Sequence, residues 1–286
     1  MLGVVGALAA ETPLAYSSAI FGWRHTMVIT GLFGIVLAIF ILLFIRDEPS
    51  AMGCNPLHTK PKFVPSLLKG IGKVIQSRQT WINALYGSLM VAPISAFAEL
   101  WDITFFMQAD HFTRYKSASL SMMIFIGIAV GGPTLGWLSD RIGRRKPIMW
   151  LGNLGTLLCL TSIIWLPIHS IALLILLLFG FGFFTSNMLL IFAINTEIHP
   201  NWATGAVIGF TNMIVIIGGT VFQPLMGALI DFFNISITGL QASGDNMTLR
   251  YILLLLPLCQ LLAGILLIFI RETFCHYKDA TELAAA

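Results

Sequence analysis

Long uncharged stretches of apolar residues alternate along this chain with shorter segments that hold nearly all of its charged residues. A helix that crosses the hydrocarbon core of a bilayer needs about 20 consecutive, mostly apolar residues. Backbone groups inside lipid must be hydrogen-bonded within the protein, which favours helices over irregular chain. The pattern therefore predicts an all-α integral membrane protein with about eight transmembrane helices. The predicted spans are roughly 2–21, 26–45, 81–107, 118–138, 148–167, 170–195, 204–230 and 251–270.

The composition agrees with a membrane protein and argues against several other classes. Of the 286 residues, 57% are hydrophobic and 10% are charged, whereas a soluble domain has about 25% charged residues. The four cysteines show no Cys-x-x-Cys spacing, and the sequence lacks a P-loop and the zinc-protease and serine-hydrolase motifs. We therefore expect no enzyme activity, cofactor or metal site. The net charge of +3 gives no sign of nucleic-acid binding, so the expected partners are membrane lipid and a small-molecule substrate.

The positive residues lie mainly on one side of the predicted topology. If the loop 139–147 is inside, the inside segments hold 12 of the 16 Lys and Arg residues. Short loops rich in Lys and Arg favour the cytoplasm. We therefore expect a multi-pass protein, in a bacterial inner membrane, with both termini in the cytoplasm. The four cations left outside are Arg24, Arg114, Lys116 and Arg250.

One long break, residues 46–80, separates the second predicted span from the third. Its second half, "FVPSLLKGIGKVIQSR", places apolar residues at helical spacing with Lys69 and Lys73 between them. Such a segment fits a helix that lies on the inner membrane surface. A short solvated loop helix is the alternative, and the sequence leaves both interpretations open.

The first predicted hairpin resembles the last one. "PLAYSSAIFGW", which starts at Pro13, is similar to "PLMGALIDFFN", which starts at Pro224, and the following helices end in "LLFIRDEP" and "LIFIRETF". Transporters are often built from repeats of several helices. If the last hairpin completes a six-helix unit, the first hairpin should complete another, and four further helices are expected before Met1.

The charged stretch "GWLSDRIGRRKP" carries a family resemblance. Its pattern Gly-x-Leu-x-Asp-Arg-x-Gly-Arg-Arg, residues 136–145, resembles the loop that follows the second helix of each half in the major facilitator superfamily. The break at 46–80 is similar to that family's central linker, and "FGWRHT" at 21–26 is similar to the turn between its fifth and sixth helices. The resemblance implies twelve helices in two halves. The implied domains are the last two helices of the N-terminal half (1–46), the linker with a surface helix (47–80), the complete C-terminal six-helix half (81–271) and a cytoplasmic tail (272–286).

In that family the loop latches the two halves together in one state of the transport cycle. Asp140 can accept hydrogen bonds from a helix N-terminus or pair with Arg144, and Gly143 permits a left-handed turn. Gly136 allows a close helix contact or a tight bend. The alternative is a cation cluster that only sets the topology. The candidate latch residues are Gly136, Asp140, Arg141, Gly143, Arg144 and Arg145.

Ionisable and polar groups within the predicted spans are candidates for a substrate or proton site. Glu11 lies near the middle of the first span, where a carboxylate needs a functional or structural reason. Glu99 and Asp102 are three residues apart, so we expect them to share a helix face near the outer mouth. Asn187 and Asn212 are expected to line a central cavity. Ordinary polar contacts between helices are the alternative in each case.

Two functions remain open from the sequence. The first is a secondary active transporter that moves a small solute by alternating access and is coupled to protons through Glu11. The second is a truncated, non-transporting remnant, or a subunit that needs a separately encoded four-helix fragment. Residues that specify a substrate are not recognisable.

Overall fold

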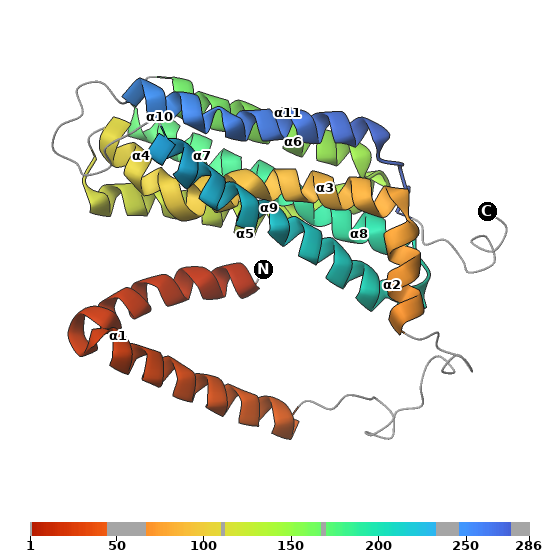
Figure 1. The fold of residues 1–286 in the computed structure, drawn as a ribbon, viewed down its shortest axis with the longest axis horizontal. Coiled ribbons are helices and arrows are strands. Elements are labelled where there is room, and N and C mark those ends of the chain that lie inside the picture. The colour runs from red at the N-terminus through yellow and green to blue at the C-terminus, as the bar shows by residue number, and fades with distance from the viewer. Residues whose placement is uncertain (1, 45–66, 110–111, 167–169, 233–245, 276–286) are drawn as a thin grey trace. The chain divides into compact units, whose positions relative to one another are not determined.

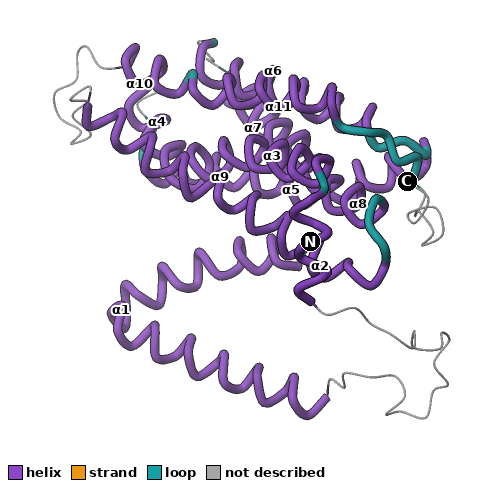
Figure 2. The backbone as a smooth tube through the Cα atoms, turned by 45° about the vertical axis from the view of Figure 1, so that its right-hand side comes forward, coloured by secondary structure: helices purple, strands orange, loops and turns teal. Residues whose placement is uncertain are grey.

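The computed structural model describes residues 2–44, 67–109, 112–166, 170–232 and 246–275, and within these ranges the chain forms helices and short connections without a strand. This confirms the prediction of an all-α protein. The chain divides into two units, residues 2–64 and 65–286, which are described separately. Figures 1 and 2 show both units.

The smaller unit contains α1 (Leu2–Phe44), which is a hairpin of two helical limbs joined at Gly22. Gly22 has φ 77° and ψ 155°, a backbone conformation that residues with a Cβ rarely adopt. The predicted turn at 21–26 is therefore present, and it depends on this glycine. Just after the bend, the Thr26 hydroxyl donates to the Gly22 carbonyl at 3.0 Å.

The larger unit is a bundle in which several long helices are interrupted. Its elements are α2 (Leu67–Gln76), α3 (Arg78–Pro93), the π-helix η2 (Ile94–Trp101), α4 (Asp102–Ala109), α5 (Arg114–Ile142), α6 (Lys146–Trp165), α7 (Ile171–Thr185), the 3₁₀ segment η3 (Ser186–Leu189), α8 (Leu190–Glu197), the 3₁₀ segment η4 (Asn201–Ala203), α9 (Thr204–Phe232), α10 (Asn246–Leu253) and α11 (Leu255–Phe269).

Seven segments of the described chain are long and apolar enough to cross a membrane. They correspond to the second through eighth predicted spans. The first predicted span, 2–21, is helical as the first limb of α1 but is not among the seven. The seven segments are Ile20–Phe44, Arg78–Gln108, Lys116–Ile142, Lys146–Trp165, Ile171–Glu197, Asn201–Phe232 and Leu249–Phe269.

Glycines allow α5 and α7 to pack backbone against backbone. A Cβ added at Gly182 would lie 1.9 Å from the carbonyl oxygen of Ile124, and one at Gly127 would lie 2.2 Å from that of Phe179. Contacts this close are possible only between residues without a side chain at these points. The packing therefore holds the middle of α5 directly against α7.

A buried apolar cluster joins α3, α5, α6, α8, α9 and α11. At its centre lie Tyr86, Met90, Met149 and Ile191, all 0% exposed. Figure 2 shows these bundle helices lying side by side, and the cluster packs between them. The ends of α5, α8 and α11 and the start of α6 meet at one end of the bundle, which we call the loop end.

Candidate functional site at the loop end

The loop between α5 and α6 is a tight turn built on Gly143. This residue has φ 71° and ψ 20°, and its N–H donates to the carbonyls of Ser139 at 3.0 Å and Asp140 at 3.2 Å. The left-handed conformation expected from the sequence is therefore present, and it closes the end of α5. Since α6 begins three residues later, the turn brings Arg145 back against the last turn of α5.

Arg145 is the centre of the site. It is 7% exposed and donates from Nη1 to Asp140 Oδ1 at 2.5 Å and to Ser139 Oγ at 3.1 Å. Its Nη2 and Nε donate to Glu197 Oε1 at 2.7 and 3.2 Å. Burial alone would lower the pKa of Arg145, but the hydrogen bonds and charge of Glu197, helped by Asp140, raise the pKa above its usual value. The cation is thus permanent and links α5, α6 and α8.

The two carboxylates that pair with Arg145 lie in different environments. The Glu197 side chain is 3% exposed, whereas the Asp140 side chain is 65% exposed. The buried carboxylate of Glu197 offsets part of the hydration that Arg145 loses on burial. Asp140 therefore contributes less to burying the cation and remains open to a second partner.

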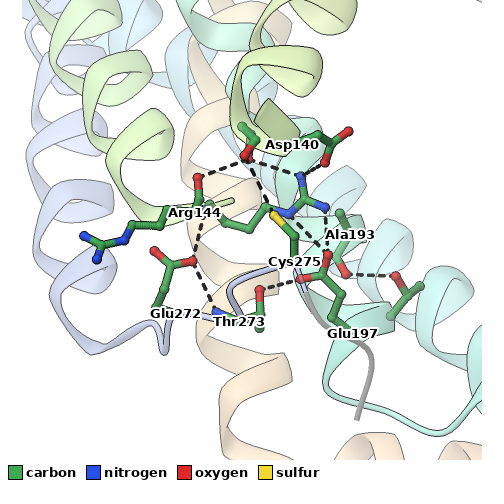
Figure 3. Close-up of polar contacts among 10 residues, drawn as sticks. Asp140, Arg144, Ala193, Glu197, Glu272, Thr273 and Cys275 are labelled. Atoms are coloured by element: carbon green, nitrogen blue, oxygen red, sulfur yellow. Dashed lines mark hydrogen bonds and ion pairs between the residues drawn. The ribbon is translucent and has the colours of Figure 1, made fainter. Parts of the chain in front are cut away.

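The segment that follows α11 covers the site. Glu272 accepts hydrogen bonds from the backbone N–H of Arg145 at 2.8 Å and of Lys146 at 3.0 Å, so its carboxylate caps the N-terminus of α6 from a distant part of the chain. The Thr273 hydroxyl donates to Glu197, and the Cys275 thiol lies 3.8 Å from the Ser139 carbonyl. Figure 3 shows these contacts around the loop.

Within the described part of the chain, the side chains of the remaining candidate latch residues make no hydrogen bond in this cluster, although the Arg144 carbonyl accepts from the Ser139 hydroxyl at 3.3 Å. The Arg141 guanidinium lies 5.1 Å from the centre of the Trp137 ring, and that of Arg144 lies 5.8 Å from the Phe274 ring. A Cβ added at Gly136 would meet nothing within 4 Å, so the expected close contact is not formed within this bundle. The expected pairing of Asp140 with Arg144 is also wrong, because the Gly143 turn places Arg145 next to Asp140 instead.

Sequence reasoning missed Glu197, Glu272 and Thr273. Glu197 lies in the segment between the predicted spans 170–195 and 204–230, and Glu272 and Thr273 lie in the predicted tail 272–286. One signal was available: these residues follow the ends of spans on the same predicted side as the loop 139–147. Their pairing with Arg145 and the start of α6 required the tertiary structure, because they are 52 and more residues away along the chain.

The structure answers differently for each of the three acidic candidates, Glu11, Glu99 and Asp102. Position 11 lies within α1, but its side chain is outside the described residues. Glu99 is exposed and accepts from Gln223 Nε2 at 3.3 Å, whereas Asp102 is 1% exposed. The expectation that both carboxylates share one face is wrong. Glu99 lies in the π-helix η2, whose wider turn after Pro93 shifts the faces relative to an α-helix.

Asn187 and Asn212 do not lie together. Asn187 is fully buried in η3, where its Oδ1 accepts from the Tyr86 hydroxyl at 2.6 Å and its Nδ2 donates to the Phe184 carbonyl at 2.6 Å. Its amide packs against Gly152. Asn212 is exposed on α9. Asn187 therefore joins helices within the bundle in this structure and does not line an open cavity, while Asn212 faces out of the bundle.

The fold and the site define a multi-pass α-helical membrane protein whose charged loop is anchored by a buried ion pair at one end of a helical bundle. The chain belongs to the Major Facilitator Superfamily, because the model of that family matches residues 103–282. This confirms the resemblance recognised in the loop and places the chain in a family of membrane transporters rather than enzymes.

Individual relatives are distant. The chain is 25% identical over 232 residues to the membrane sensor protein UhpC of Escherichia coli (strain K12), which covers 76% of this chain and 53% of that protein. It is 23% identical over 235 residues to a probable hexose phosphate transport protein of Chlamydia pneumoniae. That alignment covers 73% of this chain and 51% of the Chlamydia protein. The chain thus spans about half the length of the curated relatives it matches.

A solved structure shows the same fold. A bacterial homologue of the human lysosomal transporter Spinster, in an inward-facing and unoccupied conformation, aligns with a TM-score of 0.59 at 16% identity. The alignment covers 91% of this chain and 61% of that one. At this identity the likeness concerns the fold alone.

Proposed function

We propose that the protein takes part in secondary transport of a small solute by alternating access, with the loop end of the bundle acting as a conformational latch. The observation that carries the proposal is the position of Asp140. Its carboxylate is held by the buried Arg145, yet 65% of the side chain is exposed. A charge that is fixed in place and still accessible can contact another half of a transporter.

The contacts around Arg145 support movement of the bundle as one body. They join α5, α6, α8 and the segment after α11 at a single point. Relative movement of these helices at the loop end would break a buried ion pair, which is costly. A contact between Asp140 and a second half would therefore act on the whole bundle. With the predicted orientation, this end faces the cytoplasm, and the latch would close that side.

The chemistry of the solute is only partly constrained. A relative is named as a hexose phosphate transport protein, but the bundle spans predicted from this sequence contain no Lys or Arg that could bind a phosphate. We therefore propose that this bundle contributes polar contacts such as Asn212 and the carboxylate of Glu99, and that any anion-binding cation comes from elsewhere. Glu11 is the proposed proton-coupling residue.

The alternative is a subunit that does not transport alone and needs a separately encoded four-helix fragment, or a remnant without transport. The chain spans about half the length of its curated relatives, which is expected equally of a piece of a longer transporter. The intact mass of the native protein, purified from its own membrane, distinguishes the cases. A mass near 31.4 kDa without a co-purifying fragment supports a remnant, and a fragment supports the subunit.

The transport proposal is tested with the native protein in membrane vesicles, using pools of radiolabelled sugars, sugar phosphates and amino acids. Asp140→Ala should lower uptake while the amount of inserted protein stays the same. Asp231→Ala is the matched control, because Asp231 is also an exposed carboxylate but lies in α9, outside the loop. Uptake that is equal in the Asp140→Ala variant and the wild type contradicts the latch. Glu11→Gln should remove the pH dependence of uptake, and a retained dependence assigns Glu11 a structural role.

A further inference from the structure

Helix α2 has three different faces, although it is only ten residues long. Val74 is fully buried against Ala203 and Val207 at the start of α9. Gly70 lies on the same side, where an added Cβ would be 3.4 Å from Ala206 and 3.6 Å from the Trp202 ring. This face fixes α2 to the bundle.

The second face is apolar and only partly covered within the described part of the chain. Ile71 and Ile75 are 41% and 47% exposed. They are four residues apart, so they project from one side of the helix. The third face is polar and exposed, and it carries Lys69, Lys73 and Gln76.

The position of α2 indicates what covers Ile71 and Ile75. The helix runs crosswise to the long bundle helices at the loop end, directly before the span that begins at Arg78 (Figure 1). Two tryptophans mark this level: Trp81 donates from its indole to the Ile75 carbonyl at 2.9 Å, and Trp202 lies beside Gly70. Tryptophan is enriched where the hydrocarbon region meets the headgroups.

We infer that α2 is an in-plane membrane-surface helix that inserts Ile71 and Ile75 into the boundary between headgroups and acyl chains and holds Lys69 and Lys73 toward anionic headgroups. An amphipathic helix of this kind binds through its buried apolar area together with attraction to anionic lipid. The lysines are one turn apart on the polar face, so both can reach the headgroup layer with their flexible side chains. This role is independent of transport.

The buried face of α2, with Val74 and Gly70, connects the proposed membrane-surface helix to the bundle. Because α2 packs on the beginning of α9 and precedes α3 by one residue, it attaches the ends of both helices to the lipid surface. The lipid composition of that membrane surface would therefore affect how firmly the loop end of the bundle is held.

The test uses the full chain in vesicles that contain equal amounts of phosphatidylcholine and phosphatidylglycerol. The photoreactive residue p-benzoylphenylalanine is placed singly at positions 71 and 75, with position 76 on the polar face as the matched control. After irradiation, mass spectrometry should detect several-fold more lipid adducts at 71 and 75 than at 76. Phosphatidylglycerol should be enriched among the adducts, by up to about fivefold for each lysine. Lys69→Gln/Lys73→Gln should remove the enrichment.

Several results would overturn the inference. Equal lipid adducts on both faces would show that α2 has no preferred side, and adducts to a second copy of the chain would assign the apolar face to self-association. Hydrogen exchange of the wild-type α2 amides gives a second measurement that needs no substitution. Exchange should be slower in bilayers with phosphatidylglycerol than in pure phosphatidylcholine, and equal rates would refute the attraction to anionic lipid.

Discussion

Replacing Glu197 by Gln should destabilise the bundle strongly, because it leaves the buried Arg145 without its buried counter-charge. Two of the four side-chain hydrogen bonds of Arg145 go to Glu197, at 2.7 and 3.2 Å. The other two go to Ser139 and to Asp140, whose side chain is 65% exposed. Asp140 cannot replace the lost charge, since an ion pair with an exposed carboxylate is weakened by water.

Breaking a buried ion pair by removing one partner costs about 3–5 kcal/mol. Glutamine keeps one acceptor oxygen, so we expect the lower end of this range. For a unit of this size, about 3 kcal/mol corresponds to a decrease in Tm of roughly 6–12 °C. The assay is thermal unfolding of the purified chain in detergent, followed by circular dichroism. Glu99→Gln is the control, because Glu99 is exposed and its bond to Gln223 is long at 3.3 Å, and its effect should stay within about 0.5 kcal/mol.

A double-mutant cycle separates the ion pair from other effects. If the cost comes from an uncompensated buried cation, Arg145→Met combined with Glu197→Leu should be more stable than Glu197→Gln alone, because the buried charge is then absent. A Glu197→Gln variant with the same Tm as the Glu99→Gln control would refute the reasoning. It would mean that water reaches Arg145 in the native protein.

Three further predictions concern other parts of the larger unit. Gly182→Ala should lower stability by about 1–3 kcal/mol, because the added Cβ would meet the Ile124 carbonyl oxygen at 1.9 Å. Gly227→Ala is the control and should leave stability unchanged, because a Cβ there meets nothing within 4 Å. Equal Tm values for the two variants would contradict the close packing of α5 and α7. Gly143→Ala should cost about 1 kcal/mol because φ is positive, and Gly143→Asn should cost less in the same unfolding assay; an equal cost for both would argue against a left-handed turn. Burial, with a contribution from Lys73, lowers the pKa of His199 below 6.5, so the unfolded chain takes up the proton more readily and stability should decrease as the pH falls below that value. His199→Gln should flatten the dependence of Tm on pH, and an unchanged slope would assign it to another group.

The positions of the helices were predictable from sequence because the constraint is local. The length of an apolar run decides whether it can cross a bilayer. Within lipid, such a run must be helical, because its backbone groups have to be hydrogen-bonded internally. The turn at 21–26 was expected from the family resemblance of "FGWRHT", and the structure shows that it bends at Gly22, whose φ of 77° glycine accepts readily. The interruptions inside the spans were not foreseen. The π-helix Ile94–Trp101 and the 3₁₀ turn Ser186–Leu189 depend on how neighbouring helices pack, and the first of them invalidated the shared face expected for Glu99 and Asp102.

The family and the loop that carries the candidate latch are recognisable from the sequence alone, because residue types and spacing within ten positions suffice. The sequence did not determine the partners of that loop. Whether Asp140 pairs with Arg144 or Arg145 depends on the turn at Gly143, and the pairing of Arg145 with Glu197 joins residues 52 positions apart. Such contacts depend on where helix ends meet, and close glycine-mediated packing and the apolar core decide that. The tertiary structure therefore decided which charges are buried together, which one remains exposed, and which carboxylate caps α6.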